Sequence, residues 1–66
     1  MRERESDRQM AESQLAELHN IRVLLEEARA QARNLAEPRR RRLEAPLRAA
    51  LREIDAQISD LRDRSG

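Results

Sequence analysis

The sequence predicts an all-α protein whose two helices form an antiparallel, coiled-coil-like hairpin that pairs with a second hairpin into a four-helix bundle. Alanine, glutamate, leucine and arginine dominate the composition and aromatic residues are absent, which is typical of long helices. Two separate stretches repeat apolar residues at alternating steps of three and four, the spacing of a coiled-coil seam. Between these stretches lie Pro38, Pro46 and a run of four arginines.

The chain is short for a protein that folds alone. Its 66 residues allow one domain, residues 1–66. A domain of this size buries only about 60% of the surface that its unfolded chain exposes. The sequence has no cysteine and a single histidine, His19, so one chain holds neither a disulfide nor a nitrogen-rich metal site. We therefore expect a partner chain, which is either a second copy or a different protein.

The first helix is expected over about residues 6–36. Ser6 and Gln9 have the spacing of a capping box, in which each side chain accepts a hydrogen bond from the backbone N–H of the other residue. The predicted interaction seam of this helix consists of Leu18, Ile21, Leu25, Ala28, Ala32 and Leu35. Gln14 is a polar break in this seam. Either it is buried and sets the register, or the second helix does not extend far enough to cover it.

This helix should end near Ala36. A straight continuation of its seam would place Arg39 and Arg42 at buried positions, and burying an unpaired charge costs free energy. Pro38 also disfavours a helical conformation at the residue before it, Glu37. The chain is therefore expected to turn back on itself here.

The joint, at about residues 37–45, has two interpretations. In one, the second helix begins at Pro46, where a proline is tolerated in the first turn. In the other, Pro38 opens the helix and Pro46 kinks it. We prefer the second interpretation because it gives the two helices similar lengths and places Leu43 and Leu47 on one face.

The second helix is expected to extend to about residue 63. Its apolar positions again repeat at steps of four and three, as a seam that faces another helix requires. The predicted seam of this helix consists of Leu47, Leu51, Ile54, Ile58 and Leu61.

The arginine run makes the joint strongly basic. Residues 37–48 contain five arginines and two glutamates, a local charge of +3, whereas residues 9–27 contain one arginine and four glutamates, a local charge of −3. Three interpretations stay open for Arg39, Arg40, Arg41 and Arg42: a solvated joint, a contact with the phosphates of a nucleic acid, or a contact with an acidic protein partner.

These features predict a small non-enzymatic protein-interaction module that self-associates, most simply as a homodimer, or docks on one protein partner through its seams. A nucleic-acid-binding regulator and a dedicated adaptor or inhibitor of one target are the alternatives. No nucleophile is paired with a base and no glycine loop is present, so we expect no catalytic, cofactor-binding or metal-binding residues and no small-molecule substrate. No apolar run is long enough to span a membrane and no leader is found, so we expect a cytoplasmic protein.

Overall fold

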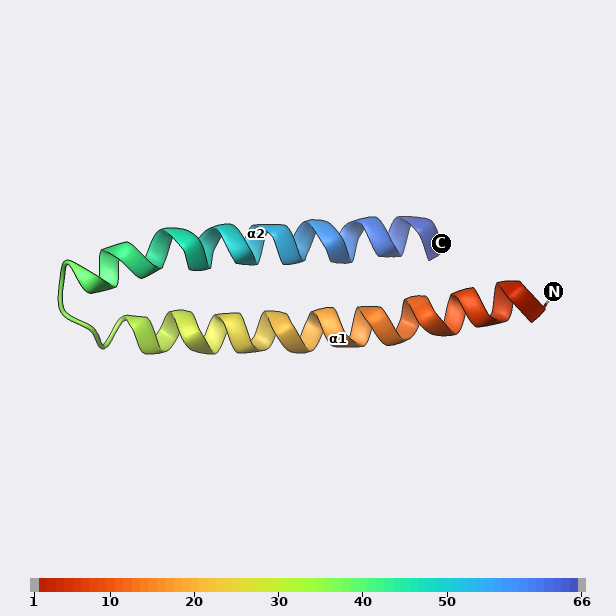
Figure 1. Ribbon diagram of the computed structural model, residues 1–66, viewed down its shortest axis with the longest axis horizontal. Coiled ribbons are helices and arrows are strands. Elements are labelled where there is room, and N and C mark those ends of the chain that lie inside the picture. Colours follow the sequence, from red (N-terminus) through yellow and green to blue (C-terminus); the bar gives the residue numbers. More distant parts are fainter. Residues whose placement is uncertain (1, 66) are drawn as a thin grey trace.

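The computed structural model describes residues 2–65, and the side chains of residues 8–64. Two helices, α1 (Arg2–Ala32) and α2 (Arg39–Ser65), pack side by side and run in opposite directions (Figure 1). Residues 33–38 connect them, and the molecule is 55 Å long. The predicted all-α helical hairpin is confirmed, since residues 2–65 contain no strand.

α1 begins and ends earlier than the sequence suggested. It starts at Arg2 rather than near Ser6, and the capping contact proposed for the Ser6 side chain lies outside the described side chains. It ends at Ala32 rather than near Ala36. The N–H groups of residues 33–35 bond to carbonyls three residues back, a tightening that often closes an α-helix. The helix thus stops before the proline restricts the chain.

α2 begins without an acidic residue in its first turn, which consists of the four arginines. These cations lie at the positive end of the helix dipole, where positive charge is unfavourable. Glu37, just before the helix, partly offsets this charge, because its carboxylate contacts Nη2 of Arg40 at 2.8 Å and Nη2 of Arg41 at 3.6 Å. Ion pairs of Glu37 therefore link the connection to the first turn of α2.

Pro46 lies inside α2, as in the second of the two interpretations, although the helix begins at Arg39 rather than at Pro38. A proline within a helix removes one backbone hydrogen bond and bends the axis. The first turns of α2 are inclined relative to the rest of the helix in Figure 1. The bend turns this end of α2 toward α1.

The core between the helices is thin. Among the described side chains, only the apolar Ala32, Leu51 and Ile58 are buried. Half-buried residues extend this line along both helices: Ala11, Leu15, Leu18, Arg22, Leu25 and Arg29 on α1, and Leu47, Ala50, Ile54 and Leu61 on α2. The two helices alone therefore leave most of their apolar surface only partly covered.

Leu51 tests how much this thin core contributes. The side chain of Leu51 is 7% exposed and that of Val23 is 55% exposed. We expect Leu51→Ala to lower the free energy of unfolding by about 2 kcal/mol or more, because it leaves a cavity between the helices. Val23→Ala should change it by less than about 0.5 kcal/mol, as is usual at the surface. Urea unfolding followed by circular dichroism measures both, and equal losses would contradict this packing.

Candidate association surface and basic tip

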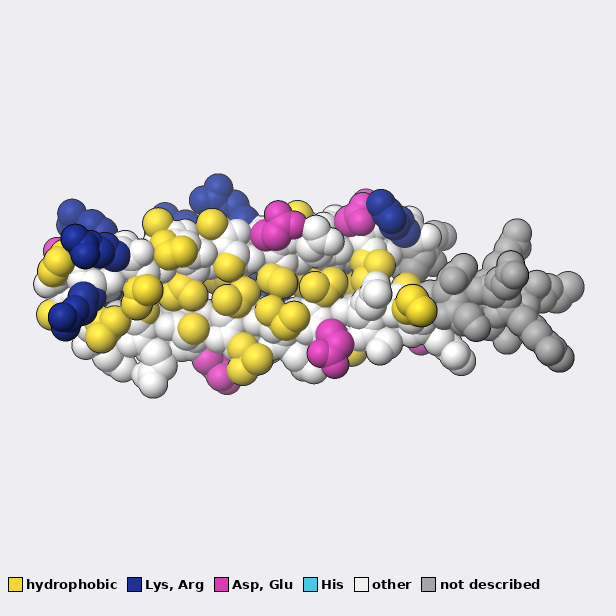
Figure 2. All heavy atoms as spheres, in the orientation of Figure 1, with side chains coloured by type: hydrophobic (Ala, Val, Ile, Leu, Met, Phe, Trp, Pro, Cys, Tyr) yellow, Lys and Arg dark blue, Asp and Glu magenta, His cyan; other side chains and the backbone are white. Residues whose placement is uncertain are grey.

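The hairpin has two unlike faces. We call one the apolar face; its residues are Ile21, Leu24 and Ala28 on one side of α1, Leu35 in the connection, and Leu43, Leu47, Ala50, Ile54 and Leu61 on the same side of α2. Residues of the two stripes line a common hollow at the connection, where Ala28 and Leu35 meet Leu43 and Leu47. Figure 2 looks onto this face, where apolar side chains form a band along both helices.

The apolar face is open to solvent. The exposed fraction is 41% for Ile21, 63% for Leu24, 40% for Leu35 and 44% for Leu43. Met10, farther along α1, is 61% exposed. Single exposed apolar side chains are ordinary, so it is their arrangement in a row over two helices that makes this face a candidate association surface.

The opposite side, which we call the polar face, carries charged residues: Arg22, Glu26 and Arg29 on α1, Arg33 in the connection, and Glu44, Arg48, Asp55 and Arg62 on α2. Neighbouring residues on it form ion pairs, including Arg48 with Glu44 at 3.4 Å. Each such pair on an exposed surface contributes little to stability. The polar face therefore suits contact with water.

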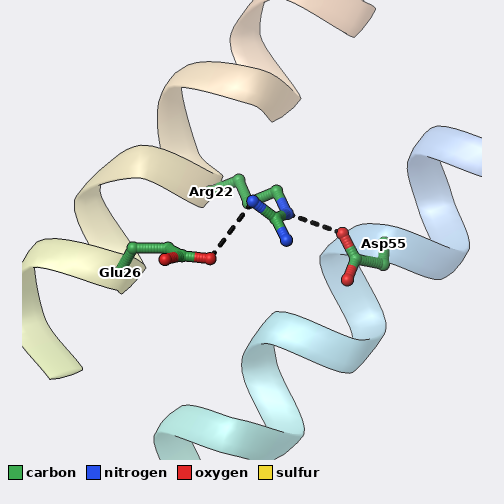
Figure 3. Close-up of polar contacts among 3 residues, drawn as sticks. All are labelled: Arg22, Glu26 and Asp55. Carbon is green, nitrogen blue, oxygen red and sulfur yellow. Dashed lines mark hydrogen bonds and ion pairs between the residues drawn. The ribbon is translucent and has the colours of Figure 1, made fainter.

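Arg22 joins the two helices on the polar face. Its Nε donates a hydrogen bond to Oδ1 of Asp55 at 2.7 Å, and its Nη1 lies 3.1 Å from Oε1 of Glu26 (Figure 3). The hydrogen bond that Arg22 donates to Asp55 and the charges of both carboxylates raise the pKa of Arg22, which is already far above neutrality. The guanidinium therefore stays charged throughout the pH range in which proteins fold. The contact shows that Arg22 lies level with Asp55 in the register of the hairpin.

The four arginines of the run do not act as one group. Arg40 and Arg41 line a hollow on the polar face together with Arg29 of α1 and Arg33 of the connection. Arg39 and Arg42 are exposed outside this hollow. Successive side chains on a helix point about 100° apart, so the four arginines together surround the start of α2.

Arg29 is the least satisfied of these cations. It lies half-buried beside the contact between the helices, and its Nε is buried with no hydrogen-bond partner among the described residues. Glu37 and Glu44 line the same hollow but pair with Arg40, Arg41 and Arg48. The hollow thus gathers four arginines and two carboxylates, a local charge of +2.

The structure divides the predicted seam of α1 between two surfaces. Leu18, Leu25 and Ala32 lie against α2, whereas Ile21, Ala28 and Leu35 belong to the exposed apolar face. All five seam residues of α2 are buried or half-buried: Leu47, Leu51, Ile54, Ile58 and Leu61. Gln14 is exposed and lines a hollow with Leu18 and Leu61 near the end of α2.

Arg22 and Arg29 are the inward-facing residues that the sequence analysis missed. The line of α1 that faces α2 is Ala11, Leu15, Leu18, Arg22, Leu25, Arg29 and Ala32, which also has steps of four and three. The sequence does not reveal this line readily, because a seam is expected to contain only apolar residues. The sequence signal that could have identified this line is an arginine at heptad spacing in one helix together with a carboxylate in the other helix.

Double-mutant cycles would test whether the contact of Arg22 with Asp55 joins the helices. We expect a larger coupling between Arg22→Gln and Asp55→Asn than between Arg64→Gln and Asp60→Asn, because the latter pair lies within one helix at 3.3 Å and is more exposed. The coupling should shrink at high salt. Equal couplings in urea unfolding would show that the cross-helix contact has no special role.

No described helix is long and apolar enough to cross a membrane, and the described side chains contain no cluster of three or more potential metal ligands. Comparisons of the chain with protein-family models, with curated proteins and with solved structures found no match.

Proposed function

We propose that the protein is a non-enzymatic interaction module that associates through its apolar face. The observation that carries this proposal is the difference between the two faces: the ion pairs of Arg22 and Arg48 lie on the polar face, while Ile21, Leu24, Leu35 and Leu43 remain exposed on the other. Covering apolar surface contributes about 25 cal/mol for each Å² removed from water. The driving force for association is therefore concentrated on one side.

The thin core supports the same proposal. Two helices touch along one line, and here that line buries three apolar side chains among those described. The conformational entropy lost on folding is about 1–2 kcal/mol for each backbone residue, which such a core offsets poorly. A second layer of helices on the apolar face would supply the missing burial. The simplest form of that layer is a homodimeric four-helix bundle.

Leu24 and Val23 offer a matched test of this surface. They are adjacent and similarly exposed, at 63% and 55%, but only Leu24 belongs to the apolar face. We expect Leu24→Glu to lower the mass in sedimentation equilibrium toward that of one chain and to reduce helicity at micromolar concentration. Val23→Glu should change neither. A native chain that stays a helical monomer at tens of micromolar would contradict self-association and favour the adaptor or inhibitor alternative.

A second candidate function is contact with nucleic-acid phosphates through the basic tip, which we define as residues 37–48, together with the neighbouring Arg29 and Arg33. The observation that favours it is the hollow shared by Arg29, Arg33, Arg40 and Arg41, together with the unpartnered Nε of Arg29. Arginine binds phosphate oxygens through two parallel hydrogen bonds. Without aromatic residues, such binding would rely on charge and shape rather than on base stacking.

Opposite substitutions in this hollow test the second candidate. Arg33→Gln should weaken binding to a short duplex at low salt and lower the salt slope by about one, the effect of one lost phosphate contact. Glu37→Gln should strengthen binding, because it removes a repelling carboxylate. Arg52→Gln, which is outside the hollow, is the control for net charge. Equal effects of Arg33→Gln and Arg52→Gln in fluorescence anisotropy would reject a localised site.

A further inference from the structure

We propose that the occupant of the apolar face is a second copy of this chain, stacked face to face and pointing the opposite way. The basic tip of each hairpin then lies beside the open end of the other, where α1 begins. This inference rests on the proposed function and adds the partner and its direction. Two features of the hairpin argue for it: its charge distribution and the positions of its exposed apolar residues.

Two stackings by a two-fold axis bring the apolar faces together. If the axis follows the long direction of the hairpin, the two tips lie at the same end and α1 packs on α2 of the second copy. If the axis runs across the hairpin, the tips lie at opposite ends and each helix packs on its own copy. Both are closed, symmetric dimers. Charge and packing must therefore select between them.

Charge favours opposite directions. The basic tip, residues 37–48, has a net charge of +3. At the open end, residues 2–17 carry three arginines and five acidic residues, a net charge of −2, and residues 60–64 are neutral. Stacked helices lie about 10 Å apart, close to the Debye length at physiological salt. Tips at the same end would repel, whereas opposite directions place +3 beside −2 twice.

The exposed apolar residues lead to the same orientation. α1 extends beyond the end of α2 at the open end (Figure 1), and Met10, near the level at which α2 ends, is 61% exposed. At the other end of the face, Leu35 and Leu43 are exposed beside the connection. In the opposite stacking, the extension of one chain lies over the apolar residues near the tip of the other. Same-end stacking would instead leave two extensions projecting together beyond both α2 helices.

Distances between spin labels test the direction. The chain has no cysteine, so Ala36→Cys labels the tip alone and Ser13→Cys labels the open end. From a rise of 1.5 Å per residue, two tip labels should be about 30–40 Å apart in the opposite stacking. A tip label and an open-end label on different chains should be within about 20 Å of each other. Adjacent tip labels would overturn the orientation while leaving the association surface intact. A monomeric chain would overturn both.

A charge variant tests the same inference without labels. Replacing Arg39, Arg40, Arg41 and Arg42 with glutamine keeps good helix formers but removes the positive charge. In the opposite stacking, we expect this variant to raise the dimer Kd about threefold to tenfold at low salt, with little effect at high salt. Tips at the same end predict the reverse, a tighter dimer, because repulsion is removed. Sedimentation equilibrium at two ionic strengths measures the difference.

Discussion

Two packed helices touch only along a narrow strip, and the narrowness of this strip determines which apolar side chains of the hairpin are buried and which stay exposed. Each helix has apolar residues over a broad part of its circumference, but the other helix covers only the strip that faces it. Ala32, Leu51 and Ile58 are buried in that strip, whereas Leu24 and Leu43 on the flanking surface stay exposed. Because the exposed large apolar residues other than Val23 lie to one side, the hairpin acquires an apolar face and a polar face.

Charge then differs between the ends of the hairpin as well as between its faces. The connection and the start of α2 are basic because four arginines surround one turn, and Glu37 neutralises only part of them. The opposite end is acidic. An apolar face supplies affinity but has little directional preference, whereas charges at its ends discriminate between orientations. The two kinds of asymmetry therefore have separate roles in the proposed dimer.

Much of the fold was predictable because its determinants are local. Periodic apolar residues, the absence of glycine within the helices and the restriction before Pro38 together specify two helices and a turn. The helix ends were less predictable, because the chain closed α1 at Ala32 with tightened hydrogen bonds that have no clear sequence signature. The apolar stripe of α2 is narrower. Its seam residues from Leu47 to Leu61 lie against α1 in the structure, as their spacing suggested.

The sequence by itself determined two amphipathic helices, a basic connection and an excess of apolar surface, since composition and spacing are properties of the chain. Only the tertiary structure decided how α1 is rotated about its own axis. Its apolar residues are spread widely enough to fit two rotations, one with Ile21 and Ala28 inside and one with Arg22 and Arg29 there. The bond from Arg22 to Asp55 exists only in the second, and it joins residues 33 positions apart. Such a contact depends on where α2 lies, so spacing within α1 does not reveal it.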